Sequence, residues 1–389
     1  MKKYLIPALA LATAWAFAGC RQAEQADTLP VIDMGKEYPE KELVVQDLFD
    51  VEYVPLETSD EFVTQGEVLD ISEHFVAVKN WNNDGNLYLF DRQNGRGVRC
   101  INRRGQSGGE YTYLGGVVLD EAGGELFVVD ASVNKILVYD WEGRFRRNVP
   151  LREGFVCHTV MNYDKEHLIV YDASAQRREG EPPSQPYYHA IISKQDGHVE
   201  RALPVHFAEA VGPYVWKGDM VAVAFPPAAI VPNQGDWLLV EISADTVYNY
   251  VPSEDEMEPF LVTLPSAEPE RLFCMSTVTD RYYFMQGMRK EFDPVTGKGF
   301  SRDDWMYDRQ EKAVYTPVVR NTDFKDGREA NVIDSPVNRH GVAALQVLSA
   351  DELVTAYEDG ELNEGPLKDI ASRLGAEDNP VLMLMKYKK

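Results

Sequence analysis

The stretch that decides the fold is Ile-Leu-Val-Tyr-Asp at residues 136–140, followed by a polar turn and a second apolar and charged segment at 145–151. An apolar strand, a turn with Asp or Gly, and a second strand together have the chemistry of a β-hairpin. The same order occurs at residues 87–91, which read Leu-Tyr-Leu-Phe-Asp, and 97–101. The chain therefore repeats a hairpin.

Three more copies extend the repeat. They lie at 190–193 with 199–205, at 237–243 with 246–251, and at 305–308 with 313–319. The residues at the turn are Asp91, Asp140, Ser193, Ser243 and Asp308, and they are separated by 49, 53, 50 and 65 residues. A period near 50 in an all-β pattern is typical of a β-propeller, here with an insertion in one blade. Asp91 and Asp140 are interpreted as turn residues.

Each unit is expected to have four strands, because two further apolar segments precede each hairpin. Several of these strands, such as 127–129 and 382–385, are apolar without alternation. A sheet with one face in water would alternate, whereas blades that stack face to face are covered on both sides. The strand pattern therefore favours a ring of stacked blades.

Five complete units end near residue 319, and the remainder supplies three segments, at 342–348, 353–357 and 381–387. The missing fourth strand is available near the N-terminus, at 43–45 and 51–56. We therefore predict an all-β, six-bladed β-propeller whose ring is closed by an N-terminal strand in the last blade.

One short helix is predicted as an insertion in blade six. Pro366 suits the first position of a helix and Gly375 suits its end. Between them, Leu367, Ile370, Ala371 and Leu374 lie on one side, so the helix is expected to pack on neighbouring loops.

The N-terminus is typical of a secretory signal, with Lys2 and Lys3, an apolar run from 4 to 18, and then Gly19 and Cys20. We expect a signal peptide at 1–19, lipid modification of Cys20, a flexible tether at 20–40 and one propeller domain at 41–389. Phe17 departs from the branched apolar residue usual three positions before a lipid-modified cysteine. The alternative is ordinary cleavage near Ala18.

The chain is acidic, with 39 Lys and Arg against 63 Asp and Glu and a formal net charge of −24. Nucleic acids and anionic lipid head groups attract basic proteins, so both are disfavoured as partners. A neutral or cationic ligand is favoured, and membrane contact is expected only through the lipid. We expect a monomer.

Three motifs carry a family resemblance. They are Pro-Leu-Glu-Thr within 51–58, Arg-Gly-Gln-Ser-Gly-Gly-Glu-Tyr at 104–111, and Asp-Asn-Pro-Val-Leu at 378–382. With these the chain resembles the six-bladed β-propeller lipoproteins of Gram-negative gut anaerobes, which are related in shape to NHL-repeat propellers. The family usually has Gly-Pro-Gly where this chain has Ser107-Gly108-Gly109. The resemblance implies the fold and export but supplies no catalytic residues.

The loops between second and third strands are expected to share one face of the ring with the connections between blades. The second-to-third loop of blade two is short, at 131–134, but four others are long: 173–186, 226–235, 289–302 and 358–379. Long loops in a compact domain usually have a role, so we expect the ligand site on this face.

Six residues on this face are candidates for ligand binding: Trp81, Asn82, Arg103, Arg104, Glu110 and Tyr111. An exposed Trp beside amide side chains suits stacking on a sugar ring. The alternative is that Trp81 wedges between blades. For the other four residues of the 103–111 segment, the alternative is a tight glycine turn whose arginine and glutamate pair locally.

Catalysis has weak support in the sequence. No nucleophile elbow or phosphate-binding loop occurs in a suitable context, and the seven histidines form no metal motif. His158, His206 and His340 lie at or near the starts of inner strands and give an alternative, a zinc or calcium site at the channel mouth. We expect no cofactor.

The sequence therefore predicts an exported, lipid-anchored propeller of the outer membrane, periplasmic or exposed at the surface. It is expected to bind a glycan, a peptide or an envelope protein on its long-loop face without catalysis. A metal-dependent hydrolase or lyase is the first alternative, and a structural subunit of an envelope complex is the second.

Overall fold

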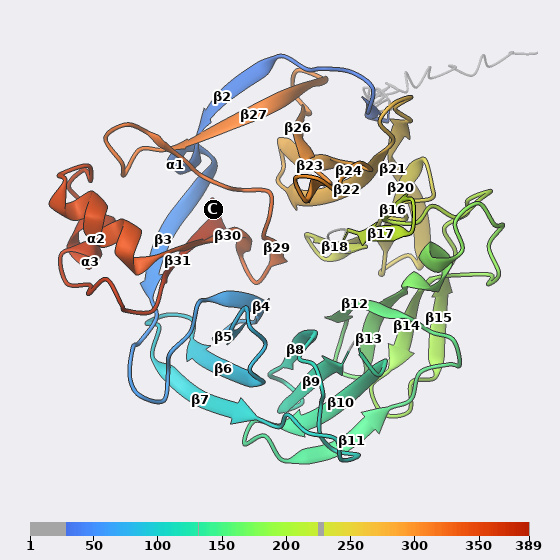
Figure 1. Ribbon diagram of the computed structural model, residues 1–389, viewed down its shortest axis with the longest axis horizontal. Coiled ribbons are helices and arrows are strands. Elements are labelled where there is room, and N and C mark those ends of the chain that lie inside the picture. Colours follow the sequence, from blue (N-terminus) through green and yellow to red (C-terminus); the bar gives the residue numbers. More distant parts are fainter. Residues whose placement is uncertain (1–28, 131, 225–228, 389) are drawn as a thin grey trace, which may run out of the picture.

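Six blades, each with four antiparallel strands, stand around a central axis in the computed structural model, which describes residues 29–130, 132–224 and 229–388 (Figure 1). The signal peptide predicted at 1–19 and the lipidated Cys20 lie outside the described residues. Blade one contains β4 (Glu67–Ile71), β5 (Phe75–Lys79), β6 (Asn86–Asp91) and β7 (Gly97–Asn102). Blade two contains β8 (Gly116–Asp120), β9 (Glu125–Asp130), β10 (Lys135–Asp140) and β11 (Phe145–Val149). Blade three contains β12 (Cys157–Asn162), β13 (His167–Asp172), β14 (His189–Ser193) and β15 (Val199–Leu203).

The second half of the chain forms the other three blades. Blade four contains β18 (Ile230–Asn233), β19 (Asp236–Leu239), β20 (Thr246–Val251) and β21 (Glu256–Leu264). Blade five contains β22 (Arg271–Val278), β23 (Tyr282–Arg289), β26 (Arg302–Asp308) and β27 (Ala313–Asn321). Blade six contains β29 (Pro336–Arg339), β30 (Val342–Leu348), β31 (Val381–Tyr387) and β3 (Phe49–Pro55). The predicted all-β, six-bladed propeller is confirmed.

Strand β6 shows why the blades lack an alternating pattern. Its four central residues, Leu87 to Phe90, are all buried, but on two different sides. Leu87 and Leu89 pack in a cluster with residues of blade two, whereas Tyr88 and Phe90 pack with residues of blade six. Burying one such side chain contributes about 1.5–3 kcal/mol. Each strand is therefore stabilised by both neighbouring blades.

The N-terminal segment runs along the outer edges of three blades. Strand β1 (Val31–Asp33) pairs parallel with β21, and β2 (Glu40–Val44) pairs parallel with β27. After α1 (Val45–Leu48), β3 pairs antiparallel with β31, with Phe49 opposite Tyr387 and Pro55 opposite Val381.

Two sequence expectations for this segment need correction. The tether predicted at 20–40 is too long, because β1 already pairs within it. Residues 43 and 44, expected beside the last blade, pair instead with blade five. A short apolar run shows that a strand will form but does not identify its neighbour.

The insertion in blade six contains two helices, α2 (Ala350–Glu358) and α3 (Pro366–Ala371), where one was predicted. The strand expected at 353–357 is wrong, because these residues belong to α2. Pro366 does begin α3, as predicted. Leu353 and Leu367 are buried in a cluster that includes Phe49, so the helices cover the rim of blade six (Figure 1).

Blade four is shifted by one strand from the prediction. The segments at 237–243 and 246–251, expected as its third and fourth strands, contain β19 and β20, its second and third. The connection from blade three contains a separate hairpin, β16 (Tyr214–Lys217) and β17 (Met220–Val223). The sequence of this hairpin resembles that of the first two strands of a blade, but the hairpin does not join any of the six sheets.

Candidate functional site

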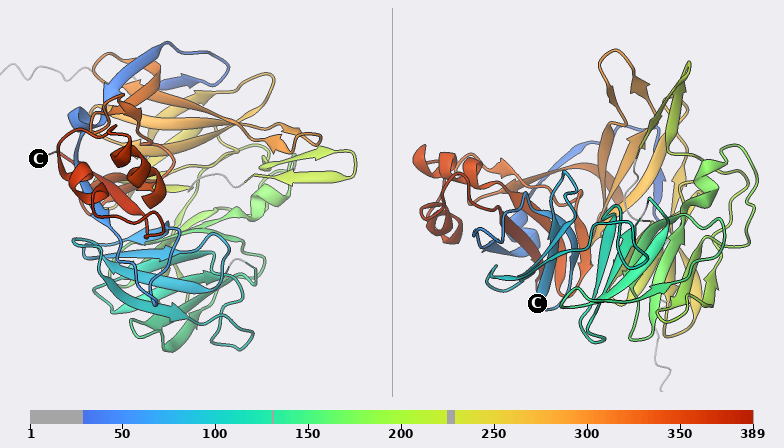
Figure 2. Two further views of the ribbon diagram at one scale, coloured as in Figure 1. Left: turned by 60° about the vertical axis from the view of Figure 1, so that its left-hand side comes forward. Right: turned by 60° about the horizontal axis from the view of Figure 1, so that its bottom comes forward.

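One face of the ring carries the longer connections, and we call it the long-loop face. It includes η1 (Ala173–Arg177), the β16–β17 hairpin, and a hairpin of β24 (Phe292–Asp293) and β25 (Lys298–Gly299). The two hairpins project from the body in the same direction (Figure 2). The expected crowding of one face by long loops is therefore present, although blade four contributes through its entry connection.

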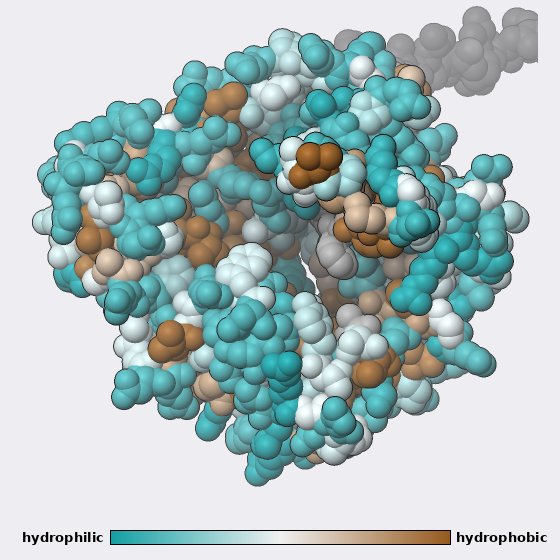
Figure 3. Space-filling model, viewed as in Figure 1, coloured by the Kyte–Doolittle hydropathy of each residue, from teal (hydrophilic) through white to brown (hydrophobic). Residues whose placement is uncertain are grey.

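A pocket of about 560 Å³ lies at the channel mouth, walled by the inner strands of blades one and six. In the view that shows the long-loop face, the surface is hollowed near the centre of the ring (Figure 3). Its polar lining residues are Glu67, Asp70, Asn331, Asp334, Ser335, Arg339 and Gln346. Its apolar lining includes Trp81, Met161, Val337 and Leu345. This volume is within the range of small-molecule sites.

Trp81 lies on the rim of this pocket. It belongs to the loop between β5 and β6, and 69% of its surface is exposed. Its backbone N–H donates to the side-chain oxygen of Gln65 at 3.0 Å, which fixes the loop but leaves the indole free for contact. The alternative in which Trp81 wedges between blades is therefore wrong. Asn82 is exposed beside it but does not line the pocket.

The other four candidates form a local structural unit outside the pocket. The Tyr111 hydroxyl is buried, donates to the carbonyl of Gly85 at 2.6 Å and accepts the Arg103 N–H at 3.0 Å. Arg103 Nε donates to the Gly143 carbonyl at 2.6 Å, and Arg104 Nη1 to that of Asn83 at 3.2 Å.

Glu110 completes this unit. Its carboxylate accepts the backbone N–H of Ser107 at 2.9 Å, and this bond holds the pKa of Glu110 below its usual value. A side chain at Gly105 would collide with this carboxylate, so any other residue there would displace it. The glycine-turn interpretation explains all four side chains.

Asp70 and Arg339 form the floor of the pocket, and sequence reasoning missed both. The Arg339 guanidinium donates to Asp70 Oδ1 across the seam between blades six and one. Asp70 Oδ2 also accepts the Leu119 N–H at 2.7 Å, so this carboxylate connects three blades. The only signal was an Asp and an Arg at the ends of inner strands, 269 positions apart in the chain.

The three histidines of the predicted metal site do not meet. His158 lies near the start of β12, His206 is exposed on the long-loop face, and His340 is exposed in a turn on the opposite face. Among the described residues, one group of three potential ligands has its atoms within 4.8 Å of one another, and it contains no histidine.

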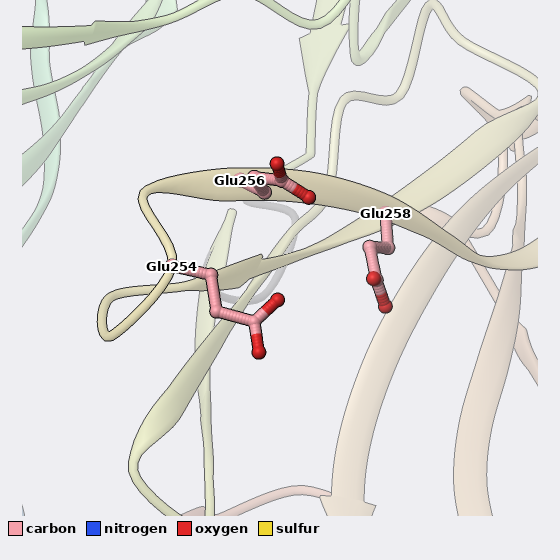
Figure 4. A group of neighbouring side chains, drawn as sticks. All are labelled: Glu254, Glu256 and Glu258. Atoms are coloured by element: carbon pink, nitrogen blue, oxygen red, sulfur yellow. The ribbon is translucent and has the colours of Figure 1, made fainter.

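That group is Glu254, Glu256 and Glu258, at the turn between β20 and β21 (Figure 4). All three are exposed at the outer edge of blade four, away from the channel. Exposed carboxylates are expected on so acidic a chain, so we interpret them as solvated surface.

A larger cavity of about 950 Å³ lies away from the channel mouth, beside α1, β2 and the C-terminal residues. Its wall includes Arg281, which pairs with Asp308 at 2.9 Å. It is lined by β2 and α1, by the turns between the first and second strands of blades four and five, and by the end of β31 in blade six. The channel mouth is the better candidate, because inner strands of two blades converge there and it opens on the long-loop face beside the exposed Trp81.

Comparison with known proteins supports the fold. A family model described as 6-bladed beta-propeller matches residues 21–211. A Bacteroides fragilis protein described as exported has 14% identity and a TM-score of 0.60, with 93% of this chain and 100% of that chain covered. A Bacteroides vulgatus protein of the duf4221 family has 9% identity and a TM-score of 0.43, over 72% and 84% of the two chains. The second score is too low to carry an argument.

A sequence search of curated proteins finds no match. Within the described part of the chain, no helix has both the length and the apolar character that a membrane crossing requires. The strand topology and the family match over residues 21–211 show that this protein is a six-bladed β-propeller.

Proposed function

We propose that the protein is an exported, lipid-anchored propeller of the cell envelope that binds a glycan at the channel mouth without catalysis. The single observation that carries the proposal is Trp81, exposed on the rim of a pocket of about 560 Å³ whose lining includes carboxylate and amide side chains. A flat aromatic face beside amide and carboxylate groups can stack on a sugar ring and bind its hydroxyls.

Export and anchoring rest on the signal-like N-terminus and Cys20, and on similarity to a protein described as exported. Eight residues lie between Cys20 and Leu29, where the described chain begins. At full extension they span about 30 Å. An anchored propeller would thus stay close to the outer membrane, inside or outside the periplasm.

Localisation is tested by substituting the cysteine. In Cys20→Ala, we expect the protein to move from the membrane fraction to the soluble fraction. Wild-type protein in the soluble fraction would contradict the anchor but leave the ligand site in place.

The ligand site is tested by thermal-shift screening of oligosaccharides, followed by calorimetry on Trp81→Ala. We expect about a tenfold loss of affinity, because the stacking contact contributes on the order of 1 kcal/mol. The melting temperature should not change, since the side chain is exposed. Trp216→Ala is the matched control, because Trp216 is also exposed on the long-loop face but lies on the β16–β17 hairpin. Equal losses in both variants would contradict the site.

A second candidate function, as a docking subunit of an envelope complex, is favoured by the same hairpin. Trp216, Met220, Val221 and Val223 are 47–62% exposed there, and Val295 is 92% exposed on the neighbouring hairpin. Hydrophobic surface gathers over these projections (Figure 3). Exposed apolar groups of this kind mark protein contacts. Loss of a co-purifying envelope protein in Trp216→Ala would favour this function.

A further inference from the structure

Arg339 lies between two cavities of the molecule. It ends β29 and lines both the mouth pocket and a second cavity of about 420 Å³ that opens among the turns of the opposite face. Its side chain is 19% exposed, and that of its partner Asp70 is 3% exposed. The ion pair therefore separates the two cavities. Of its two side chains, the arginine is the one that a ligand can reach.

The protein leaves much of this guanidinium unused. An arginine side chain has five N–H donors, and the described residues give Arg339 one partner, Asp70. The carboxylate of Asp70 is shared between Arg339 and the backbone, because its two oxygens also accept the N–H groups of Ile71 at 2.9 Å and Leu119 at 2.7 Å. Burial lowers the pKa of Arg339 to about 10, so the pair does not fully replace the solvation of the cation.

The other acids of the pocket are already neutralised by neighbours. Glu67 pairs with Lys79 at 3.2 Å, and Asp334 pairs with Arg302 at 3.3 Å. Among the described residues that line this pocket, Arg339 is the one basic side chain, and Asp70 does not use all of its N–H donors. The acidity of the whole chain disfavours anions at long range, but it is screened by salt over about 10 Å.

Between its floor and its rim, the pocket has the shape and the polar groups to hold an elongated, uncharged part of a ligand. All five residues of β4 line the pocket, which gives it a depth of about 13 Å at the usual rise of a strand. Gln346 and Ser335 offer amide and hydroxyl groups along the way, and Trp81 stands at the rim. A ligand that fills this space contacts the indole of Trp81 at the rim and the guanidinium of Arg339 at the floor.

We propose that the ligand is an acidic oligosaccharide, whose terminal carboxylate binds Arg339 at the floor while a neutral sugar ring stacks on Trp81. This inference rests on the proposed function and adds the chemical class of the ligand. It also departs from the expectation of a neutral or cationic ligand. A planar carboxylate matches the guanidinium in geometry and charge, and a neutral hydroxyl does not.

The test compares two ligands by calorimetry on the purified protein: a trisaccharide that ends in glucuronic acid and the same trisaccharide that ends in glucose. We expect the acid to bind about tenfold more tightly, as a charge-assisted hydrogen bond implies. In Arg339→Gln, the two affinities should become equal within about twofold. Arg99→Gln is the matched control, because Arg99 is exposed on β7 at the outer edge of blade one.

Arg339→Gln leaves Asp70 without its cation and can unfold the protein. The double variant Asp70→Asn, Arg339→Gln removes both charges, so no buried charge is left without a partner. The preference of the wild-type protein for the acidic sugar can be measured without any variant. Equal binding of both sugars, or a preference that survives in either variant, overturns the inference and leaves the proposed function standing. A neutral tripeptide that binds through its terminal carboxylate, where neither sugar binds, overturns the glycan assignment. Failure of all three ligands overturns the inference and the glycan site together.

Discussion

His189 is fully buried between blades three and four, and its Nδ1 atom has no hydrogen-bond partner among the described residues. Its Nε2 atom lies 3.2 Å from the Ala229 carbonyl, so the neutral ring donates there. Burial lowers the pKa of His189 to about 4, against 6.5 for a free side chain. The folded protein therefore resists protonation at a residue that the unfolded chain protonates readily.

The consequence is a loss of stability in acid. The contribution of His189 is complete above pH 6.5 and declines as the pH falls towards 4. Between pH 7 and 4.5, we expect this residue to account for about 2 to 3 kcal/mol of the decrease in the free energy of unfolding. Denaturant titrations of wild type and His189→Gln measure it, because the variant lacks the titrating group. Parallel pH profiles for the two proteins would contradict the assignment.

The turn residues could be predicted from the sequence at this scale. Asp140 Oδ1 accepts the N–H groups of Glu142 at 3.1 Å and Arg144 at 2.8 Å, which confirms its expected role. Asp91 caps its own turn in the same way. These contacts span two to four residues, so local chemistry determines them. The contact between Asp70 and Arg339 spans 269 residues and could not be predicted, because it exists only when blades six and one meet.

Strand β3 is the element whose packing matters most for the last blade. Phe49 at its start is 1% exposed and belongs to the cluster that contains Met383, Met385 and Leu353. In Phe49→Ala, we expect the free energy of unfolding to fall by about 3–5 kcal/mol, since the change leaves a cavity in a packed core. Chemical denaturation measures the loss. Val98→Ala, on the exposed side of β7, should change stability by less than about 0.5 kcal/mol.

The elements that sequence reasoning misassigned share a physical cause. Residues 353–357 are Leu-Val-Thr-Ala-Tyr, a short apolar run that fits a strand or a buried helix equally well. Acids at 351 and 352 and Gly360 were the available signs of a helix. The β16–β17 hairpin was also ambiguous, because a residue pattern does not reveal whether another blade covers a pair of strands.

The fold of the whole molecule was predictable because the hairpin repeats about every 50 residues, and repeated sheets with two apolar faces bury both faces by stacking in a ring. The rim residue Trp81 was predicted as well, since its loop position follows from the strand order. The floor of the pocket was not, because inner strands from different blades create it together.

Metal independence is a property expected of the molecule as a whole. The three candidate histidines lie apart, so a chelator has no histidine site to empty. We expect the melting temperature to change by less than about 1 °C when EDTA is added to the purified protein, since the three histidines are too far apart to hold a metal together. A drop of several degrees, restored by zinc or calcium, would reinstate the metal-site alternative.

The run of the N-terminal segment along blades four, five and six has a mechanical consequence. For a chain held by its N-terminus, a pull on the bound ligand loads β1 first, and β1 has three residues. The five residues of β2 come next. Detachment of residues 31–48 from the rim would leave a free segment with an extended length of about 60 Å before the force reaches β3. Strands β1 and β2 would then detach under load while the six blades stay folded and the ligand stays bound.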